Sequence, residues 1–158
     1  MTNVKPMPSP SVQGKKLSKT DGQPLSEPYM YLSTIAALQY LTHTWPDTTY
    51  VVNQLSQFLQ TPIDVHWQTA KRVIRYISGT KHYDLYFQPS PNLQVSTYYN
   101  ANWASNLDDR KSVVTYYTFV GNNIVSWSSR KQTVVARSST ESEYRALAHA
   151  TSEVLWLQ

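Results

Sequence analysis

The chain has 158 residues, enough for one domain or two small ones. Hydrophobic residues make up 41% of it and charged residues only 15%, which favours a packed core over full disorder. The absence of cysteine excludes disulfides, thiolate zinc sites and cysteine nucleophiles. The net charge of +4 favours polyanionic partners such as nucleic acid, although an ordinary basic domain would carry the same charge.

Residues 1–28 hold five of the nine prolines and show neither a helical nor a strand period. We therefore predict a flexible lead-in over 1–28. Its lysines could touch phosphates or remain solvated, and the sequence leaves both open for Lys15, Lys16 and Lys19. The first residues lack the apolar core of a signal peptide. No apolar run approaches the roughly 18 residues of a membrane helix, so we expect no membrane partner.

Residues 29–82 repeat a helical period three times, which predicts a small antiparallel bundle with short connections. Asp64 is the expected cap of the third helix and Gly79 its expected stop. The three segments, each with the apolar stripe expected to face the core, are 29–43 (Tyr31, Ile35, Leu38), 46–60 (Val51, Leu55, Phe58, Leu59) and 62–79 (Trp67, Ala70, Val73, Ile74, Ile77).

A basic ridge follows the outer side of the third expected helix. Lys71, Arg72 and Arg75 share that side, and Lys81 follows the helix. Such a ridge can grip a sugar-phosphate backbone, so these four residues are the candidate nucleic-acid contacts. An ordinary solvated helix face has the same pattern, and the sequence does not separate the two.

Residues 83–158 change to short β-branched and aromatic runs and then return to a helical period. The expected strands are 84–87, 93–99, 113–120, 123–129 and 133–137, and the expected helix is 138–158 with a buried stripe of Leu147, Ala150, Val154 and Leu157. The fold class is therefore α+β, a small helical bundle followed by a β-meander plus one helix. Since one helix covers only one face of a sheet, we expect residues 83–158 to form an incomplete domain.

Two places could carry chemistry, the strand end with Asn100 and Asn102 and the helix start with Glu141 and Glu143. A two-metal nuclease needs several carboxylates at such a junction to hold Mg²⁺. Asparagine offers only a neutral carbonyl oxygen where aspartate offers an anion. For Glu143 a capping box with Thr140 is the alternative role.

Three stretches resemble copia-type retrotransposon polyproteins: "ALQYLTHTWPDTTYVVNQLSQFLQTPIDVHWQTAKRVIRYISGT", "IVSWSSRK" and "VVARSSTESEYRALAHATSEVLWLQ". The resemblance covers residues 4–158. It implies that residues 1–88 end a reverse transcriptase region, with 29–82 as its helical thumb or connection. It also implies that residues 93–158 begin a ribonuclease H domain, so that 83–158 would be a truncated ribonuclease H-like fold.

The resemblance also assigns site residues. The family's strand motif Tyr-Ser-Asp-Ala-Asp-Trp-Ala-Gly is matched by residues 98–105, so its first catalytic aspartate falls on Asn100 and the next on Asn102. The family's catalytic glutamate falls on Glu143. Asn100 and Glu143 are therefore the ancestral catalytic and metal positions. The parent family uses Mg²⁺, and we expect none to be bound here.

Two glycines that the family usually carries are replaced, one by Asp84 and the other by Thr115. We expect a fragment of a reverse transcriptase/ribonuclease H polyprotein that has lost catalysis. The parent activities are RNA-directed DNA synthesis and hydrolysis of RNA–DNA hybrids. A nucleic-acid-binding remnant and a degenerate reading frame without selected function remain alternatives. The expected partners are an RNA–DNA hybrid and other pieces of the polyprotein, in the cytoplasm or nucleus.

Overall fold

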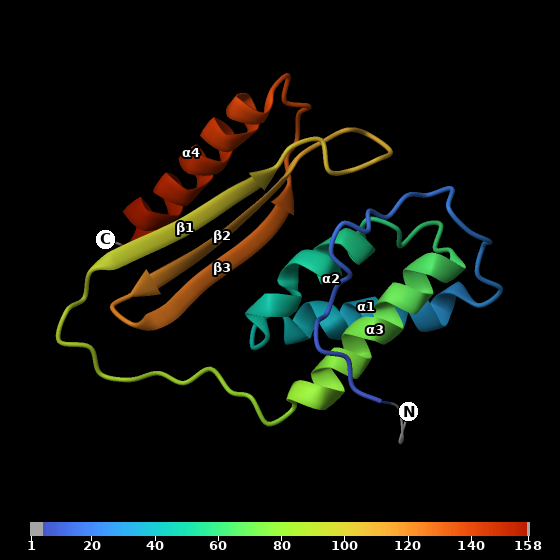
Figure 1. Ribbon diagram of the computed structural model, residues 1–158, viewed down its shortest axis with the longest axis horizontal. Coiled ribbons are helices and arrows are strands. Elements are labelled where there is room, and N and C mark those ends of the chain that lie inside the picture. The colour runs from blue at the N-terminus through green and yellow to red at the C-terminus, as the bar shows by residue number, and fades with distance from the viewer. Residues whose placement is uncertain (1–4, 158) are drawn as a thin grey trace. The chain divides into compact units, whose positions relative to one another are not determined.

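The computed structural model describes residues 5–157 (Figure 1). The chain divides into two compact units, with the boundary between Leu85 and Tyr86. No helix within the described residues combines the length and the apolar character that crossing a bilayer requires.

The N-terminal unit contains three α-helices and a short 3₁₀ helix: α1 (Pro28–Leu41), η1 (Pro46–Thr48), α2 (Thr49–Ser56) and α3 (Asp64–Thr80). Pro28 and Pro46 each stand at the start of a helix, where a missing N–H costs nothing. All three predicted helical segments are confirmed. The second is shorter than predicted, because its first turn is 3₁₀ and its α-helix ends at Ser56.

The predicted apolar stripes form the core of this unit. Tyr31 and Ile35 of α1, Leu55 of α2 and Val73 of α3 are all fully buried. The Tyr31 hydroxyl donates a hydrogen bond of 2.7 Å to the Leu55 carbonyl, which ties α1 to the end of α2. Further members of the stripes pack around this centre, with Leu59, Trp67, Ile74 and Ile77 partly buried.

The segment before α1 has no helix and is held against the helices. Leu17 joins the core with 7% of its surface exposed. Pro24 forms an isolated antiparallel bridge with Ile63, and the Leu25 amide donates to the Pro62 carbonyl at 3.1 Å. The lysines at 15, 16 and 19 are exposed. Residues 1–4 of the predicted lead-in lie outside the described part of the chain.

His66 anchors the start of α3, a role that no pattern in the sequence indicated. Its ring is fully buried and stacks on Phe58 with centroids 3.9 Å apart. Nδ1 accepts from the Ile63 amide, so Nε2 carries the proton and donates to the Ser18 carbonyl at 3.0 Å. The prediction that Asp64 caps the helix is wrong, since Asp64 is already helical and Ile63 precedes it.

The C-terminal unit is a three-stranded antiparallel meander with one helix across it (Figure 1). Its elements are β1 (Val95–Asn102), β2 (Val113–Val120), β3 (Asn123–Lys131) and α4 (Ser139–Leu157). Gly121 makes the turn between β2 and β3 with a φ of +57°, a conformation that suits glycine. The predicted α+β class is confirmed in this general form.

Two predicted strands are wrong. Residues 84–87 and 133–137 are irregular. Tyr86 and Phe87 are 83% and 59% exposed, and Val135 is 51% exposed, so neither run packs as a strand of the sheet does. β-branched and aromatic composition favours a strand only where a neighbouring strand pairs with it.

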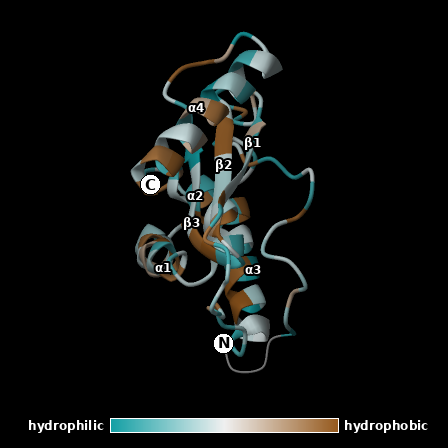
Figure 2. Cartoon of the chain, turned by 90° about the vertical axis from the view of Figure 1, so that its left-hand side faces the viewer, coloured by the Kyte–Doolittle hydropathy of each residue, from teal (hydrophilic) through white to brown (hydrophobic). Residues whose placement is uncertain are grey.

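Small residues, and not the predicted leucine, bring α4 against the sheet. Ser142, Ala146 and Ala150 are the buried residues of α4, and Ala146 packs with Ala101 and Val114. Leu147 is 40% exposed, so its predicted place in the buried stripe is wrong. Figure 2 shows hydrophobic residues on both β2 and α4.

The two replaced family glycines do not strain the backbone. Within the described residues, positive φ outside glycine occurs at Ala104 (+47°) and Arg110 (+58°). Thr115 lies inside β2, and Asp84 lies in the irregular segment after α3. Neither replacement therefore occupies a conformation that requires glycine.

Candidate functional site

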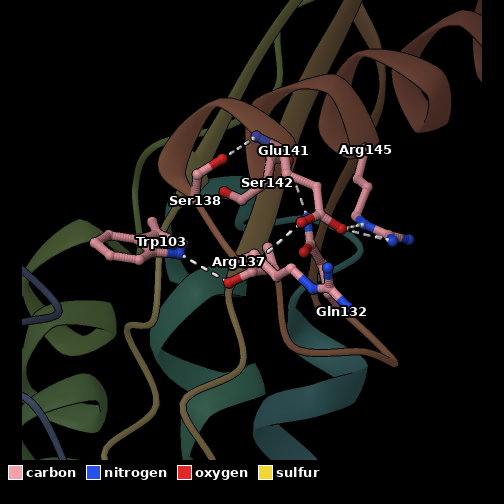
Figure 3. Close-up of polar contacts among 8 residues, drawn as sticks. Trp103, Gln132, Arg137, Ser138, Glu141, Ser142 and Arg145 are labelled. Carbon is pink, nitrogen blue, oxygen red and sulfur yellow. Dashed lines mark hydrogen bonds and ion pairs between the residues drawn. The ribbon is translucent and has the colours of Figure 1, made fainter.

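The start of α4 is fixed by Ser138 and Glu141 (Figure 3). The Ser138 hydroxyl accepts from the Glu141 amide at 3.1 Å. One carboxylate oxygen of Glu141 accepts from the Arg137 amide at 2.8 Å, and the other accepts from the Arg145 guanidinium at 2.8 Å. The hydrogen bond from the Arg137 amide lowers the pKa of Glu141 below its ordinary value, and the bond from the Arg145 side chain adds a smaller effect in the same direction.

The predicted capping box of Thr140 and Glu143 is therefore wrong by two residues. The stretch "SSTESE" contains two overlapping spacings of the Ser/Thr-x-x-Glu kind, and the helix begins at the first. The Ser138 carbonyl also accepts the first helical hydrogen bond, from the Ser142 amide at 3.2 Å. Glu143 is consequently not needed for capping.

Glu143 instead lies against the end of β1. Its Oε1 accepts from the Ala101 amide at 3.4 Å. Ala101 stands between Asn100 and Asn102, so the fold brings the glutamate to the backbone that joins the two asparagines. Both asparagines are exposed, whereas Ala101 is buried against α4. Residues more than 40 positions apart thus meet at one strand end.

This strand end carries one carboxylate and two neutral amides. No group of three or more His, Cys, Asp or Glu side chains within residues 5–157 could hold a metal ion. A pair of Mg²⁺ ions needs several anionic oxygens to offset its charge and orient a water. The donors present at Asn100, Asn102 and Glu143 do not fit such a pair.

The acids that follow the two asparagines most closely in the sequence, Asp108 and Asp109, belong to a hydrogen-bonded loop. Asn106 Oδ1 accepts from the Asp108 and Asp109 amides at 2.9 and 3.0 Å, which closes an Asx turn. Asp109 also pairs with Lys131 at 2.8 Å. Partial burial raises the pKa of Asp109, but the bonds to Lys131 and the Lys111 amide outweigh it and lower the pKa overall.

Trp103 fixes the loop that leaves the strand end, and no signal in the sequence indicated this role. Its indole Nε1 donates to the Ala136 carbonyl at 3.1 Å, which joins this loop to the connection before α4 (Figure 3). The next residue, Ala104, adopts the positive φ, and its amide donates to the buried Ser112 hydroxyl at 3.2 Å.

The basic ridge lies in the N-terminal unit, on and after α3. Lys71 sits 5.2 Å from the centre of the Trp67 ring, in a cation–π contact. Arg72 donates from Nε to the Ser9 carbonyl at 3.1 Å, and Arg75 from Nε to the Lys5 carbonyl at 2.8 Å. Lys71, Arg72 and Arg75 line one cavity, and Lys81 lies apart from it as the residue after the helix.

Fold and site together define an α+β chain with a helix glutamate set against an asparagine-flanked strand end. Comparison with known proteins identifies its family. The Retrovirus-related Pol polyproteins from transposons RE2 and RE1 of Arabidopsis thaliana are each 40% identical over 157 residues, 99% of this chain. The Secreted RxLR effector protein 161 of Plasmopara viticola is 43% identical over 128 residues, 80% of this chain and 90% of that protein.

The chain belongs to the copia-type retrotransposon Pol polyproteins, as the sequence resemblance indicated. It spans 11% of the length of the RE2 and RE1 polyproteins. No protein-family model matches the chain, and no solved structure matches it significantly.

Proposed function

We propose that the chain is the piece of a Pol polyprotein that joins the end of the reverse transcriptase to the start of a ribonuclease H-like domain, and that it binds nucleic acid without cleaving it. The order of the elements supports this proposal, because a helical unit is followed by a three-stranded meander and a helix across it. Similarity to Pol polyproteins along 99% of the chain supports it as well.

The observation that carries the proposal is the contact of Glu143 with the Ala101 amide. It puts the glutamate of the family motif beside the positions where the family has aspartates. Those positions hold Asn100 and Asn102, so the acidic cluster that would bind two Mg²⁺ ions is reduced to one carboxylate. Losing one preorganised stabilising group typically costs about 10²–10³ in rate, and here two ligands are replaced together.

Binding would depend on the cations of α3. Lys71, Arg72 and Arg75 come from one helix and line the same cavity, so they present their charge over a short distance. Nucleic-acid binding through such contacts releases counterions, so affinity falls steeply as salt rises. The RNA–DNA hybrid is the substrate that the parent activities imply.

The test measures binding of a labelled RNA–DNA hybrid between about 50 and 200 mM salt. The unmodified chain should bind with an affinity that falls steeply as salt rises. Alanine at Lys71, Arg72 and Arg75 should lower the slope of log affinity against log salt by the contribution of about two to three phosphate contacts. A control variant with alanine at Lys16, Lys111 and Arg130 has the same net charge as the α3 variant but keeps the three cations of α3. Absent binding, a flat salt dependence, or equal losses in the two variants would refute the proposal.

A further inference from the structure

A cavity of about 520 Å³ opens in the N-terminal unit between the lead-in and helices α2 and α3. This volume lies in the range of small-molecule sites. Its apolar lining comes from Met7, Val12 and Leu17 of the lead-in and Val51 of α2. Leu17 and Val51 belong to the packed core, so this part of the wall is firmly positioned.

The rest of the lining is strongly basic. Four cationic side chains border the cavity, Lys15 from the lead-in and Lys71, Arg72 and Arg75 from α3. No aspartate or glutamate is among the described residues that line it. Cations gathered in a concave, partly apolar site interact with an anion more strongly than they do on an open surface.

The two arginines are held in place by the lead-in. Arg72 donates to both the carbonyl and the hydroxyl of Ser9, at 3.1 and 3.0 Å. The Ser9 hydroxyl in turn donates to the Ser11 carbonyl at 2.9 Å, and Arg75 donates to the Lys5 carbonyl. Two bonds fix the plane of the Arg72 guanidinium, and one bond tethers Arg75. Because a guanidinium has five N–H donors, each arginine keeps further donors for a ligand.

Neutral hydrogen-bonding groups complete the lining. They are Ser11, Gln54, Gln68 and Thr69. The Gln54 amide nitrogen donates to the Tyr50 hydroxyl at 2.9 Å, which fixes the side chain while its carbonyl oxygen keeps acceptor capacity. The cavity therefore combines an anion site, an aliphatic wall and polar groups that can meet the edge of a heterocycle.

We infer that this cavity binds a nucleoside phosphate, either free or as an unpaired residue of a strand. The cations bind the phosphate, the aliphatic side chains pack on one face of the base, and the glutamines hydrogen-bond to its edge. The inference rests on the proposed nucleic-acid function and adds to it a pocket for a single nucleotide. The arginine planes can also stack on a base, as they do in single-strand recognition.

The first test is titration of the full chain with AMP and, separately, with inorganic phosphate at low salt. AMP should bind at least about tenfold more tightly than phosphate, since only AMP uses the aliphatic wall. Lys15→Ala should weaken AMP binding by about tenfold, as expected for loss of a charged hydrogen bond. Lys16→Ala removes the same charge from the neighbouring residue, which does not line the cavity, and should leave AMP binding unchanged.

A second variant separates the cavity from charge alone. Gln68→Trp leaves the net charge unaltered and places a large ring at the cavity wall, so it should abolish AMP binding. AMP binding equal to phosphate binding, equal losses in the Lys15 and Lys16 variants, or full AMP binding by Gln68→Trp would overturn the inference. Circular dichroism of each variant confirms that its helices are intact.

The source of the nucleotide is distinguished by a short single-stranded RNA. Tighter binding of the RNA, with competition against AMP, assigns the cavity to an unpaired residue of a strand, and preference for AMP assigns it to the free nucleotide. If hybrid binding remains salt-dependent while AMP does not bind, only the cavity inference fails. If AMP binds but the hybrid does not, the proposed function fails and the cavity stands as a nucleotide site.

Discussion

Replacing Ser138 by alanine tests where α4 begins, and hence whether Glu143 is available to β1. Ser138 Oγ accepts from the Glu141 amide, and its loss leaves that amide without its cap. An N-terminal cap of this kind is worth about 1 kcal/mol. With a urea slope of about 2 kcal/mol per molar, the unfolding midpoint should fall by about 0.5 M.

Thr140→Ala is the matched control, because Thr140 is exposed and is the cap that the sequence pattern predicted. It should change stability by less than about 0.5 kcal/mol. Hydrogen exchange localises the effect: the Ser142 amide, which bonds to the Ser138 carbonyl, should exchange about fivefold faster in Ser138→Ala. A larger loss of stability in Thr140→Ala than in Ser138→Ala would refute the conclusion that Ser138 caps α4.

The same cap predicts a pH dependence. The pKa of Glu141 is lowered in the folded chain by the Arg137 amide and by Arg145. The stability from its ionised form is therefore full above the unfolded pKa of about 4.3 and is lost as pH falls through the folded value. Glu141→Gln should lose less stability than the parent between about pH 5 and pH 3. An unchanged acid profile would show that Glu141 does not cap the helix as an anion.

Three further variants probe the core of the N-terminal unit and two glycine turns. Tyr31→Phe removes the hydroxyl bonded to the Leu55 carbonyl, which keeps its bond from the Phe58 amide, so the loss should be about 1 kcal/mol in urea unfolding at pH 7. Burial raises the pKa of Tyr31, so its stabilising contribution fades as pH rises above about 10, where the gap between variant and parent should close. Gly121→Ala should cost more than about 1 kcal/mol, because φ is +57° and a Cβ would meet Ser90 Oγ at 2.3 Å and Asn92 O at 2.6 Å. Gly14→Ala, at φ +76° with no atom within 4 Å, should carry the backbone cost alone, and a thermal melt in which Gly14→Ala is the worse variant would contradict this ranking.

The helical core was predictable because apolar spacing directly reports which side of a helix is buried. Tyr31, Ile35 and Leu38 recur at that spacing and are all buried in α1. The α4 interface was not predictable in the same way, since Ala146 and Ala150 approach the sheet closely while the larger Leu147 faces outward. Close packing of a helix on a sheet selects small residues, which a search for large apolar ones overlooks.

The candidate site was only partly predictable for a similar reason. The positions of Asn100 and Glu143 came from motif resemblance, but their proximity depends on how α4 crosses β1. The two overlapping capping spacings in "SSTESE" could not be separated by spacing, because both satisfy the same rule. His66 was missed because its two partners, the Ile63 amide and the Ser18 carbonyl, are backbone groups that carry no sequence signal.

The most direct test of the account is hydrolysis of a labelled RNA–DNA hybrid by the purified chain with Mg²⁺, with Glu143→Gln measured alongside. The account predicts that both proteins bind the hybrid and that neither cleaves it above the rate without protein, because Asn100 and Asn102 leave a single carboxylate at the strand end. Mg²⁺-dependent turnover by the parent chain that Glu143→Gln abolishes would contradict it.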